Sequence, residues 1–125
     1  ATCHEERLPV KTILINNGGL GMVRQWQRII YKERFSAIDL GPSPDFVKLA
    51  EAYGCTGIRA TKPSEVRPAL EKMIATPGPV VVDVWVDKHE CVFPMVPAGG
   101  ANTDMIVAPP SREVRDRAAK SQTGF

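Results

Sequence analysis

The stretch Val10–Ile30, VKTILINNGGLGMVRQWQRII, decides the fold, because it predicts a strand, a tight turn and a helix in direct succession. Residues 10–15 are largely apolar and β-branched, which is typical of a buried strand. The carboxamides Asn16 and Asn17 follow, and then GGLG, a turn that glycine-rich sequence forms at little conformational cost. Beyond the turn, a helix is expected from about Gly21 to an end near 31–35, because apolar residues recur at helical spacing: Met22, Val23, Trp26, Ile29 and Ile30.

The turn between this strand and this helix is a candidate ligand site. Open α/β sheets bind ligands where the carboxyl ends of strands meet the amino ends of helices. Backbone N–H groups at a helix start suit an anion such as phosphate. An asparagine side-chain oxygen and a glycine carbonyl two residues later suit Mg²⁺ or Ca²⁺. On the local sequence alone, the simpler interpretation that Asn16 and Asn17 only shape the turn is favoured.

The rest of the chain predicts an α/β fold, with a parallel sheet that has helices on both faces. Residues 1–7 have the character of a helix end, so we expect the polypeptide to continue upstream. Ser43 is the expected N-cap of a helix that begins at Pro44 and stops at Gly54. The other expected elements are a strand at 56–60, a helix at 64–75 that contains Pro68, and a strand at 80–86. They amount to half of a parallel layer.

Composition restricts the function further. The chain has 125 residues and a formal charge of +2, which gives no argument for nucleic-acid binding. It has no apolar run long enough to span a membrane. Cys3, Cys55 and Cys91 lack the spacing of a disulfide framework or a zinc site and are expected to be free thiols. Asp83 lies in the last apolar strand, where its place alone suggests that it faces a ligand. Other charged candidates are expected at the surface: His4, Glu5, Glu6, His89 and Glu90.

Several segments together resemble a known enzyme family. LINNGGLGMVRQWQ looks like the second half of the thiamine diphosphate motif, the half that ends in paired asparagines. GMVRQWQ is similar to the large catalytic subunit of acetolactate synthase (acetohydroxyacid synthase). LPVK, TPGPVVVDVWVD and VFPMVPAGG fit that family in the same order, so the resemblance covers about residues 1–106. The first half of the motif, Gly-Asp-Gly, does not occur in this sequence.

This resemblance implies a cofactor site at the turn. In the family, Mg²⁺ bridges the protein and the diphosphate of the cofactor. Carried over, its ligands here are the side chain of Asn17 and the carbonyl of Gly19, and an acidic ligand comes from the missing half-motif. Main-chain atoms of Leu20, Gly21 and Met22 would lie near the diphosphate. The neighbouring asparagine, residue 16, is expected to bond the turn backbone rather than the metal.

The resemblance also implies a substrate pocket along the helix. Trp26 would line the mouth of the active site, favour 2-ketobutyrate over pyruvate as second substrate, and contact herbicides. The two acceptors differ by one methylene, which a shaped pocket wall can distinguish by ~1–3 kcal/mol. Val23 and Ile30 share this helix face and would line the same pocket. The competing interpretation is that all three side chains are ordinary core residues.

The implied function is part of a thiamine-diphosphate- and Mg²⁺-dependent carboligase, a transferase. It would decarboxylate pyruvate and add the two-carbon unit to a second 2-keto acid, forming acetolactate or acetohydroxybutyrate for branched-chain amino-acid biosynthesis. The glutamate that activates the cofactor comes from another domain of a partner subunit in this family. No catalytic residue is therefore predicted here, and the isolated chain is expected to be inactive. Residues 1–107 would form the C-terminal part of the cofactor-binding domain, followed by a polar, mobile tail at 108–125.

Further expectations and alternatives follow from the same resemblance. The full-length enzyme would be a homodimer or homotetramer, with FAD in another domain and a regulatory small subunit as further implied components. It would be cytoplasmic in a bacterium and plastid or mitochondrial in a eukaryote. Two alternatives stay open. One is a related thiamine-diphosphate enzyme of the glyoxylate carboligase or pyruvate oxidase type, and the other is a non-catalytic half-domain that assembles with another polypeptide.

Overall fold

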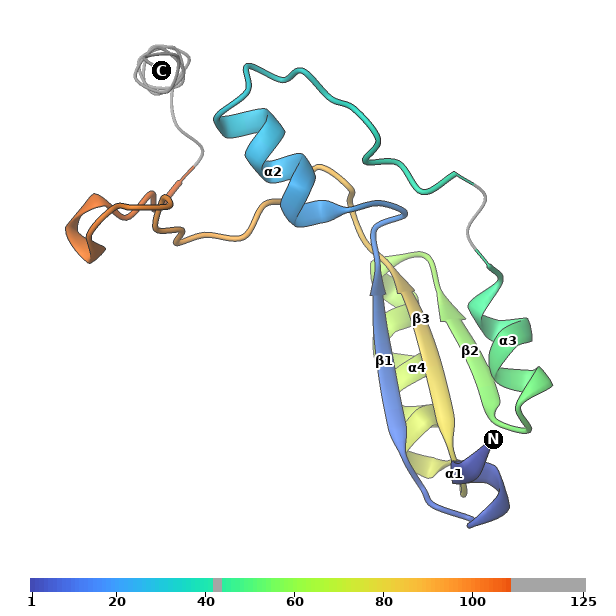
Figure 1. Ribbon diagram of the computed structural model, residues 1–125. Helices are drawn as coiled ribbons and strands as arrows, with labels where there is room; N and C mark the ends of the chain where they lie inside the picture. Colours follow the sequence, from blue (N-terminus) through green and yellow to red (C-terminus); the bar gives the residue numbers. More distant parts are fainter. Residues whose placement is uncertain (42–43, 109–125) are drawn as a thin grey trace. The chain divides into compact units, whose positions relative to one another are not determined.

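The computed structural model describes residues 1–41 and 44–108 (Figure 1). The chain divides into two compact units. The first comprises Ala1–Gly18 and Gly41–Asp87, and the second comprises Gly19–Leu40 and Lys88–Phe125. Each unit is described below by itself. The polar tail expected at 108–125 falls, apart from its first residue, outside the described residues.

The first unit is built on a parallel sheet of three strands in the order β1-β3-β2. The bounds are β1 Lys11–Asn16, β2 Thr56–Ala60 and β3 Val80–Trp85. β3 lies at the centre, where four of its six residues are buried: Val80, Val82, Asp83 and Val84. The prediction of a parallel sheet is confirmed, and each predicted strand bound lies within one residue of the observed one.

Helix α4, Pro63–Ala75, covers one face of this sheet (Figure 1). Its buried residues Ala69 and Met73 pack against alternate β3 side chains, of which Val82 is fully buried. Successive residues of a strand point to opposite faces, so Val80, Val82 and Val84 all face α4. Pro68 lies inside the helix as its sixth residue, and α4 begins one residue before the expected start at 64.

Helix α3, Phe46–Ala52, packs against the opposite face of β2 and β3. Gly57 of β2 makes this contact possible, because a Cβ atom there would lie 2.7 Å from the carbonyl oxygen of Val47. Helices therefore cover both faces of the sheet, as predicted. The short helix α1, Thr2–Glu5, precedes β1.

The start of α3 differs from the prediction. The expected first helical residue, Pro44, lies outside the helix, which begins at Phe46. Asp45 is the N-cap, and its Oδ1 accepts the backbone N–H groups of Val47 and Lys48. An aspartate cap satisfies two donors that would otherwise be orphaned, which moves the start two residues on. Ser43, the expected cap, lies outside the described residues.

The second unit contains helix α2, Gly21–Ile29, and the irregular segment after Lys88, which includes the 3₁₀-helix η1, Asn102–Asp104. α2 ends earlier than the expected 31–35, because Lys32 and Glu33 have φ values of +54° and +59°, which a right-handed helix does not allow. No helix in the described residues is both long and apolar enough to cross a membrane.

Candidate functional site

Asn16, the last residue of β1, shapes the turn that follows it. Its Oδ1 accepts the backbone N–H of Gly18 at 3.0 Å, and its Nδ2 donates to Oδ1 of Asp83 at 2.9 Å. Gly18 has φ +66°, the left-handed region that glycine adopts without a Cβ penalty. The expectation that Asn16 bonds the turn backbone is confirmed. Asn17, which follows directly, is half-buried.

On the other side of the turn, Gly19 lies too close to backbone for any side chain. A Cβ at Gly19 would lie 2.7 Å from the carbonyl oxygen of Ile38, and the N–H of Leu20 donates to that same oxygen at 2.8 Å. Ile38 is almost fully buried. The entry into α2 is therefore fixed by a backbone contact, for which glycine at position 19 is required.

The amino end of α2 fits an anion. Leu20 is its N-cap, no side chain caps the helix, and its first turn contains no acidic residue. The N–H groups of Gly21 and Met22 belong to this first turn, where intrahelical partners are lacking and the helix dipole is positive. These donors suit an anionic group such as a diphosphate. That Asn17 and the carbonyl of Gly19 hold Mg²⁺ stays a prediction.

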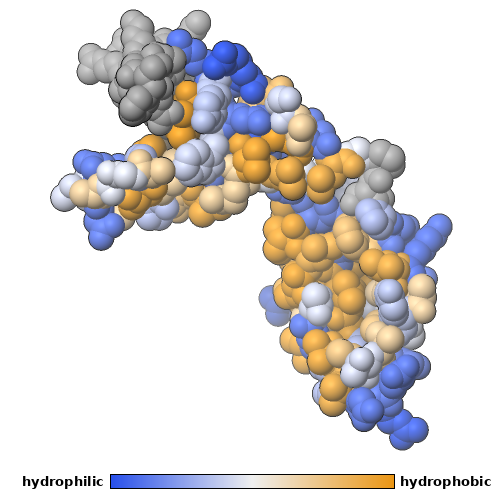
Figure 2. All heavy atoms as spheres, in the orientation of Figure 1, coloured by the Kyte–Doolittle hydropathy of each residue, from blue (hydrophilic) through white to orange (hydrophobic). Residues whose placement is uncertain are grey.

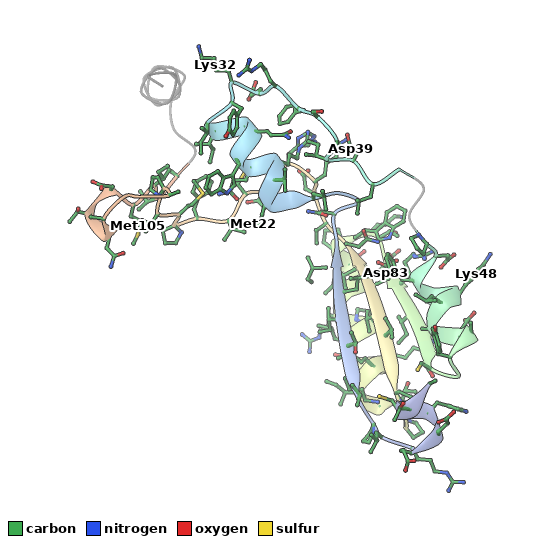
Figure 3. The ribbon with its side chains drawn as sticks, viewed as in Figure 1. Met22, Lys32, Asp39, Lys48, Asp83 and Met105 are labelled. Carbon is green, nitrogen blue, oxygen red and sulfur yellow. The ribbon has the colours of Figure 1, made fainter. Side chains whose placement is uncertain are left out.

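Asp83 lies near the carboxyl end of β3 and is only 1% exposed (Figure 3). Three side chains donate to its carboxylate: Asn16 at 2.9 Å, Arg59 Nε at 3.1 Å and Trp85 Nε1 at 3.2 Å. The suggestion that Asp83 faces a ligand is wrong, because both of its oxygens are taken up by protein donors within the first unit. Its partners come from β1, β2 and β3, which only the folded sheet brings together.

A second carboxylate extends this cluster. Arg59 Nη2 donates to Oδ1 of Asp45 at 2.6 Å, and its guanidinium lies 5.8 Å from the ring centroid of Trp85. The hydrogen bond from Arg59 holds the pKa of Asp45 below its usual value, with help from the backbone N–H of Lys48. Hydrogen bonds to both carboxylates raise the pKa of Arg59. We call Asn16, Asp45, Arg59, Asp83 and Trp85 the Asp83 network.

Two of the three predicted pocket residues line a cavity in the second unit. Val23 and Trp26 border an open hollow of about 450 Å³, together with three further side chains: Gln27, Tyr31 and Arg34. Ile30 is not among the lining residues and is only 7% exposed, so core packing accounts for it. Two aromatic rings and one cation lining an open hollow suit a small, anionic organic molecule. The assignment to substrate stays a prediction.

Contacts that the sequence did not indicate hold α2 to the irregular segment of its own unit. Gln25 is 2% exposed, and its amide accepts the N–H and donates to the carbonyl of Val92, each at 2.8 Å. Arg24 Nη2 lies 3.3 Å from Nδ1 of His89. Arg28 Nη1 donates to the His89 carbonyl and contacts the sulfur of Cys91.

The remaining charged candidates are exposed, as predicted: His4, Glu5, Glu6, His89 and Glu90. All three cysteines are half-buried and free, as predicted. In the part of the chain that the structure describes, no three His, Cys, Asp or Glu side chains gather as metal ligands would.

Comparison with known protein families shows which family the chain belongs to. The model of the thiamine pyrophosphate (thiamine diphosphate) enzyme C-terminal TPP-binding domain matches residues 1–84, two thirds of the chain. The chain belongs to this family. Its turn at residues 16–22 is accordingly part of a thiamine-diphosphate-binding domain, and the uncapped amino end of α2 is consistent with that ligand.

Individual relatives of this chain are acetolactate synthases. The enzyme from Mycobacterium avium is 48% identical over 113 residues, which are 86% of this chain. The isozyme 2 large subunit of Escherichia coli is 41% identical over 84% of this chain. Acetolactate synthase 1 of rice, a chloroplastic protein, is 44% identical over 87%. The chain spans about a fifth of the length of these relatives, 18% or 19%.

Proposed function

We propose that this chain forms part of a thiamine-diphosphate- and Mg²⁺-dependent acetolactate synthase, and that it holds the diphosphate end of the cofactor. The observation that carries the proposal is the turn at residues 16–22, an uncapped helix start that directly follows a β-strand and paired asparagines. The similarity to acetolactate synthases over more than four fifths of the chain supports the choice among thiamine-diphosphate enzymes.

Each part of the turn has its own task in this proposal. The first N–H groups of α2 bind and orient the diphosphate. The side-chain oxygen of Asn17 and the carbonyl of Gly19 hold Mg²⁺, which needs further ligands from the cofactor and from another part of the protein. When bound, thiamine diphosphate supplies the electron sink that lets a 2-keto acid lose CO₂. Pyruvate then contributes a two-carbon unit to the keto carbon of a second 2-keto acid.

The hollow beside Trp26 is proposed to receive the acceptor acid. Arg34 supplies a cation suited to a carboxylate, and the Val23 and Trp26 side chains supply an apolar wall for the alkyl group. Such a wall favours 2-ketobutyrate, because burying one additional methylene is worth ~1–3 kcal/mol. The products are acetolactate or acetohydroxybutyrate, which lead to branched-chain amino acids.

The free edge of β1 supports the view that the functional domain is larger than the described sheet. Within residues 1–41 and 44–108, β1 has a hydrogen-bonded strand on one side only. The side chains of Ile13 and Ile15 are 46% and 63% exposed, and Figure 2 shows apolar surface over this part of the first unit. Further polypeptide that covers this surface would complete the domain, with FAD, a partner subunit or a regulatory subunit beyond it. We therefore expect the isolated chain not to catalyse.

The same exposed edge favours a second candidate, a non-catalytic half-domain that assembles with a separate polypeptide. Mixing the chain with the complementary N-terminal part of a relative distinguishes the two: restored activity from the mixture supports assembly of half-domains. No observation favours the glyoxylate carboligase or pyruvate oxidase alternatives.

The central test is made on the full-length enzyme that contains this sequence. Acetolactate formation from pyruvate is measured as a function of Mg²⁺ and thiamine diphosphate, for the wild type and for Asn17→Ala. We expect the wild type to require both cofactors and the variant to need at least tenfold more Mg²⁺ for half-maximal activity. Arg67→Ala, which removes one exposed ion pair on α4, is the control and should behave like the wild type. Unchanged Mg²⁺ dependence in Asn17→Ala would contradict the proposal.

A further inference from the structure

Stability alone does not explain why residue 83 is an aspartate. It is a carboxylate, 1% exposed, in the central strand between two buried valines. Burying a charge carries a desolvation penalty of several kcal/mol, and replacing a buried ion pair by apolar residues of similar volume is often neutral or stabilising. An apolar residue would therefore serve packing at this position at least as well. The carboxylate must be explained by what it orients.

The hydrogen bonds identify the oriented group. Asp83 Oδ1 accepts from Asn16 Nδ2, and this bond fixes which end of the Asn16 carboxamide faces the turn. The other end, Oδ1, thereby accepts the N–H of Gly18 and holds it at φ +66°. The backbone of residue 17 lies between these two anchored residues. The conformation that presents Asn17 is thus set by a chain of two hydrogen bonds that begins at Asp83.

The second oxygen of the Asp83 carboxylate, Oδ2, is also hydrogen-bonded. Arg59 and Trp85 both donate to Oδ2, which leaves Oδ1 to the Asn16 amide. Arg59 is in turn held by Asp45, the N-cap of α3. The guanidinium supplies the positive charge that makes a buried carboxylate tolerable.

We propose that Asp83 is a positioning residue for the cofactor-binding turn, acting through Asn16. This inference rests on the proposed function, in which Asn17 and the Gly19 carbonyl hold Mg²⁺. Asp83 does not touch the cofactor in this proposal. It supplies the acceptor that locks the Asn16 side chain, as supporting residues do around metal ligands, where their loss typically weakens metal binding 10- to 100-fold.

The isosteric variant Asp83→Asn loses hydrogen bonds whichever way its amide lies. With its oxygen toward Asn16, its NH₂ group would face the two donors Arg59 and Trp85, which costs two hydrogen bonds instead of one, so the oxygen is expected to stay with Arg59 and Trp85. If its oxygen stays with Arg59 and Trp85, its NH₂ group meets the NH₂ group of Asn16. If Asn16 then rotates to offer its oxygen, its NH₂ group meets the N–H of Gly18, and the turn loses its bond. The single substitution therefore changes almost no volume and removes the lock.

The reciprocal substitution restores it. In Asn16→Asp/Asp83→Asn, the new amide at 83 donates to the new carboxylate at 16, which still accepts from Gly18. The oxygen at 83 still accepts from Arg59 and Trp85. All hydrogen bonds of the chain are kept, with one reversed, and the total charge is unchanged. A residue that mattered only through its own charge would not be rescued in this way.

The experiment titrates the full-length apoenzyme with Mg²⁺ at saturating thiamine diphosphate, and reads binding by isothermal titration calorimetry alongside the Mg²⁺ dependence of activity. We expect Asp83→Asn to weaken Mg²⁺ binding 10- to 100-fold with a smaller change in kcat, and the double variant to recover to within about fivefold of the wild type. Val82→Ala, one residue away on the opposite face, is the matched control: it lowers the melting temperature by cavity formation and should leave Mg²⁺ binding unchanged.

The outcomes separate the two proposals. Wild-type Mg²⁺ binding by both Asn17→Ala and Asp83→Asn would overturn the proposed function. Lost binding in Asn17→Ala with wild-type binding in Asp83→Asn would overturn the positioning role alone. So would failure of the double variant to rescue, or equal weakening by Val82→Ala. Where Asp83→Asn does not fold, Asn16→Ala removes the same link from a half-buried side chain and must weaken Mg²⁺ binding to a similar extent.

Discussion

Gln25 is the polar side chain whose removal has the clearest expected effect on the second unit. It is 2% exposed, and both ends of its amide bond the main chain of Val92. Gln25→Ala orphans one N–H and one carbonyl, at ~1–3 kcal/mol each. Val92 is 64% exposed, so water reaches the vacated site and the lower part of this range applies. We expect local opening to become about 2–3 kcal/mol easier.

Hydrogen exchange of the amides at 88–96 measures this quantity directly. In the regime where exchange reports the equilibrium population of the open form, 2–3 kcal/mol corresponds to roughly 30- to 150-fold faster exchange at Val92. The matched control is Gln27→Ala, on the same helix. Gln27 bonds the N–H and the carbonyl of Ser36 in the same two-ended way, at 3.0 Å each. Its loss should speed exchange at Ser36 and leave Val92 unaffected.

A charged version of the same side chain adds a pH test. In Gln25→Glu one carboxylate oxygen still accepts the Val92 N–H, but the other faces the Val92 carbonyl, so the ionised form is disfavoured in the folded state and its pKa rises. Protonation restores a donor to that carbonyl. A raised folded-state pKa gives stability that is present at low pH and lost as the pH rises through that pKa. Slow exchange at Val92 in Gln25→Ala, or pH-independent exchange in Gln25→Glu, would refute the assignment.

Three further predictions follow from single contacts. Gly57→Ala should lower the melting temperature by several degrees in a thermal scan, because its Cβ would lie 2.7 Å from the Val47 carbonyl oxygen; a wild-type melting curve would contradict the α3 packing. The hydrogen bond from Arg59 is the main reason why the pKa of Asp45 is lowered in the folded state. The ionised Asp45 therefore stabilises the fold above the usual aspartate pKa, and this stability is lost as the pH falls through the folded-state pKa. Asp45→Asn should flatten the acid limb of a curve of unfolding free energy against pH. Trp26→Leu in the full-length enzyme should reduce the kcat/KM preference for 2-ketobutyrate over pyruvate about tenfold or more, and an unchanged preference would remove Trp26 from the acceptor pocket.

Local patterns in the sequence were sufficient for the elements but not for their polar contacts. Consecutive β-branched residues predicted β3, and the bounds of β2 were predicted residue for residue. The carboxyl end of α2 and the start of α3 were missed, because the first depends on the backbone at Lys32 and the second on the side-chain cap that Asp45 supplies. Helix ends are decided by single hydrogen bonds, to which periodicity is insensitive.

Part of the candidate site could likewise be predicted from the sequence, and part could not. The paired asparagines and the glycines were visible in the sequence because they are neighbours. The role of Asp83 was not visible, because its partners Asn16 and Arg59 lie 67 and 24 residues away along the chain. Strand order and register bring them together, since Leu14 and Arg59 both pair with Asp83. The one feature of the sequence that could have indicated a network is the single aspartate in a valine-rich strand, because a buried charge needs hydrogen-bond partners nearby.

β3 contributes both to the hydrophobic core of the first unit and to the candidate site, through side chains on opposite faces of the strand. Val80, Val82 and Val84 face α4 and belong to the hydrophobic core. Asp83 points to the opposite face, where it bonds Asn16, the residue at which the turn of residues 16–22 begins. Strand alternation therefore assigns packing and positioning to separate faces of one element. This separation is why a cavity at Val82 and an amide at Asp83 are expected to have different effects, the first on the melting temperature and the second on Mg²⁺ affinity.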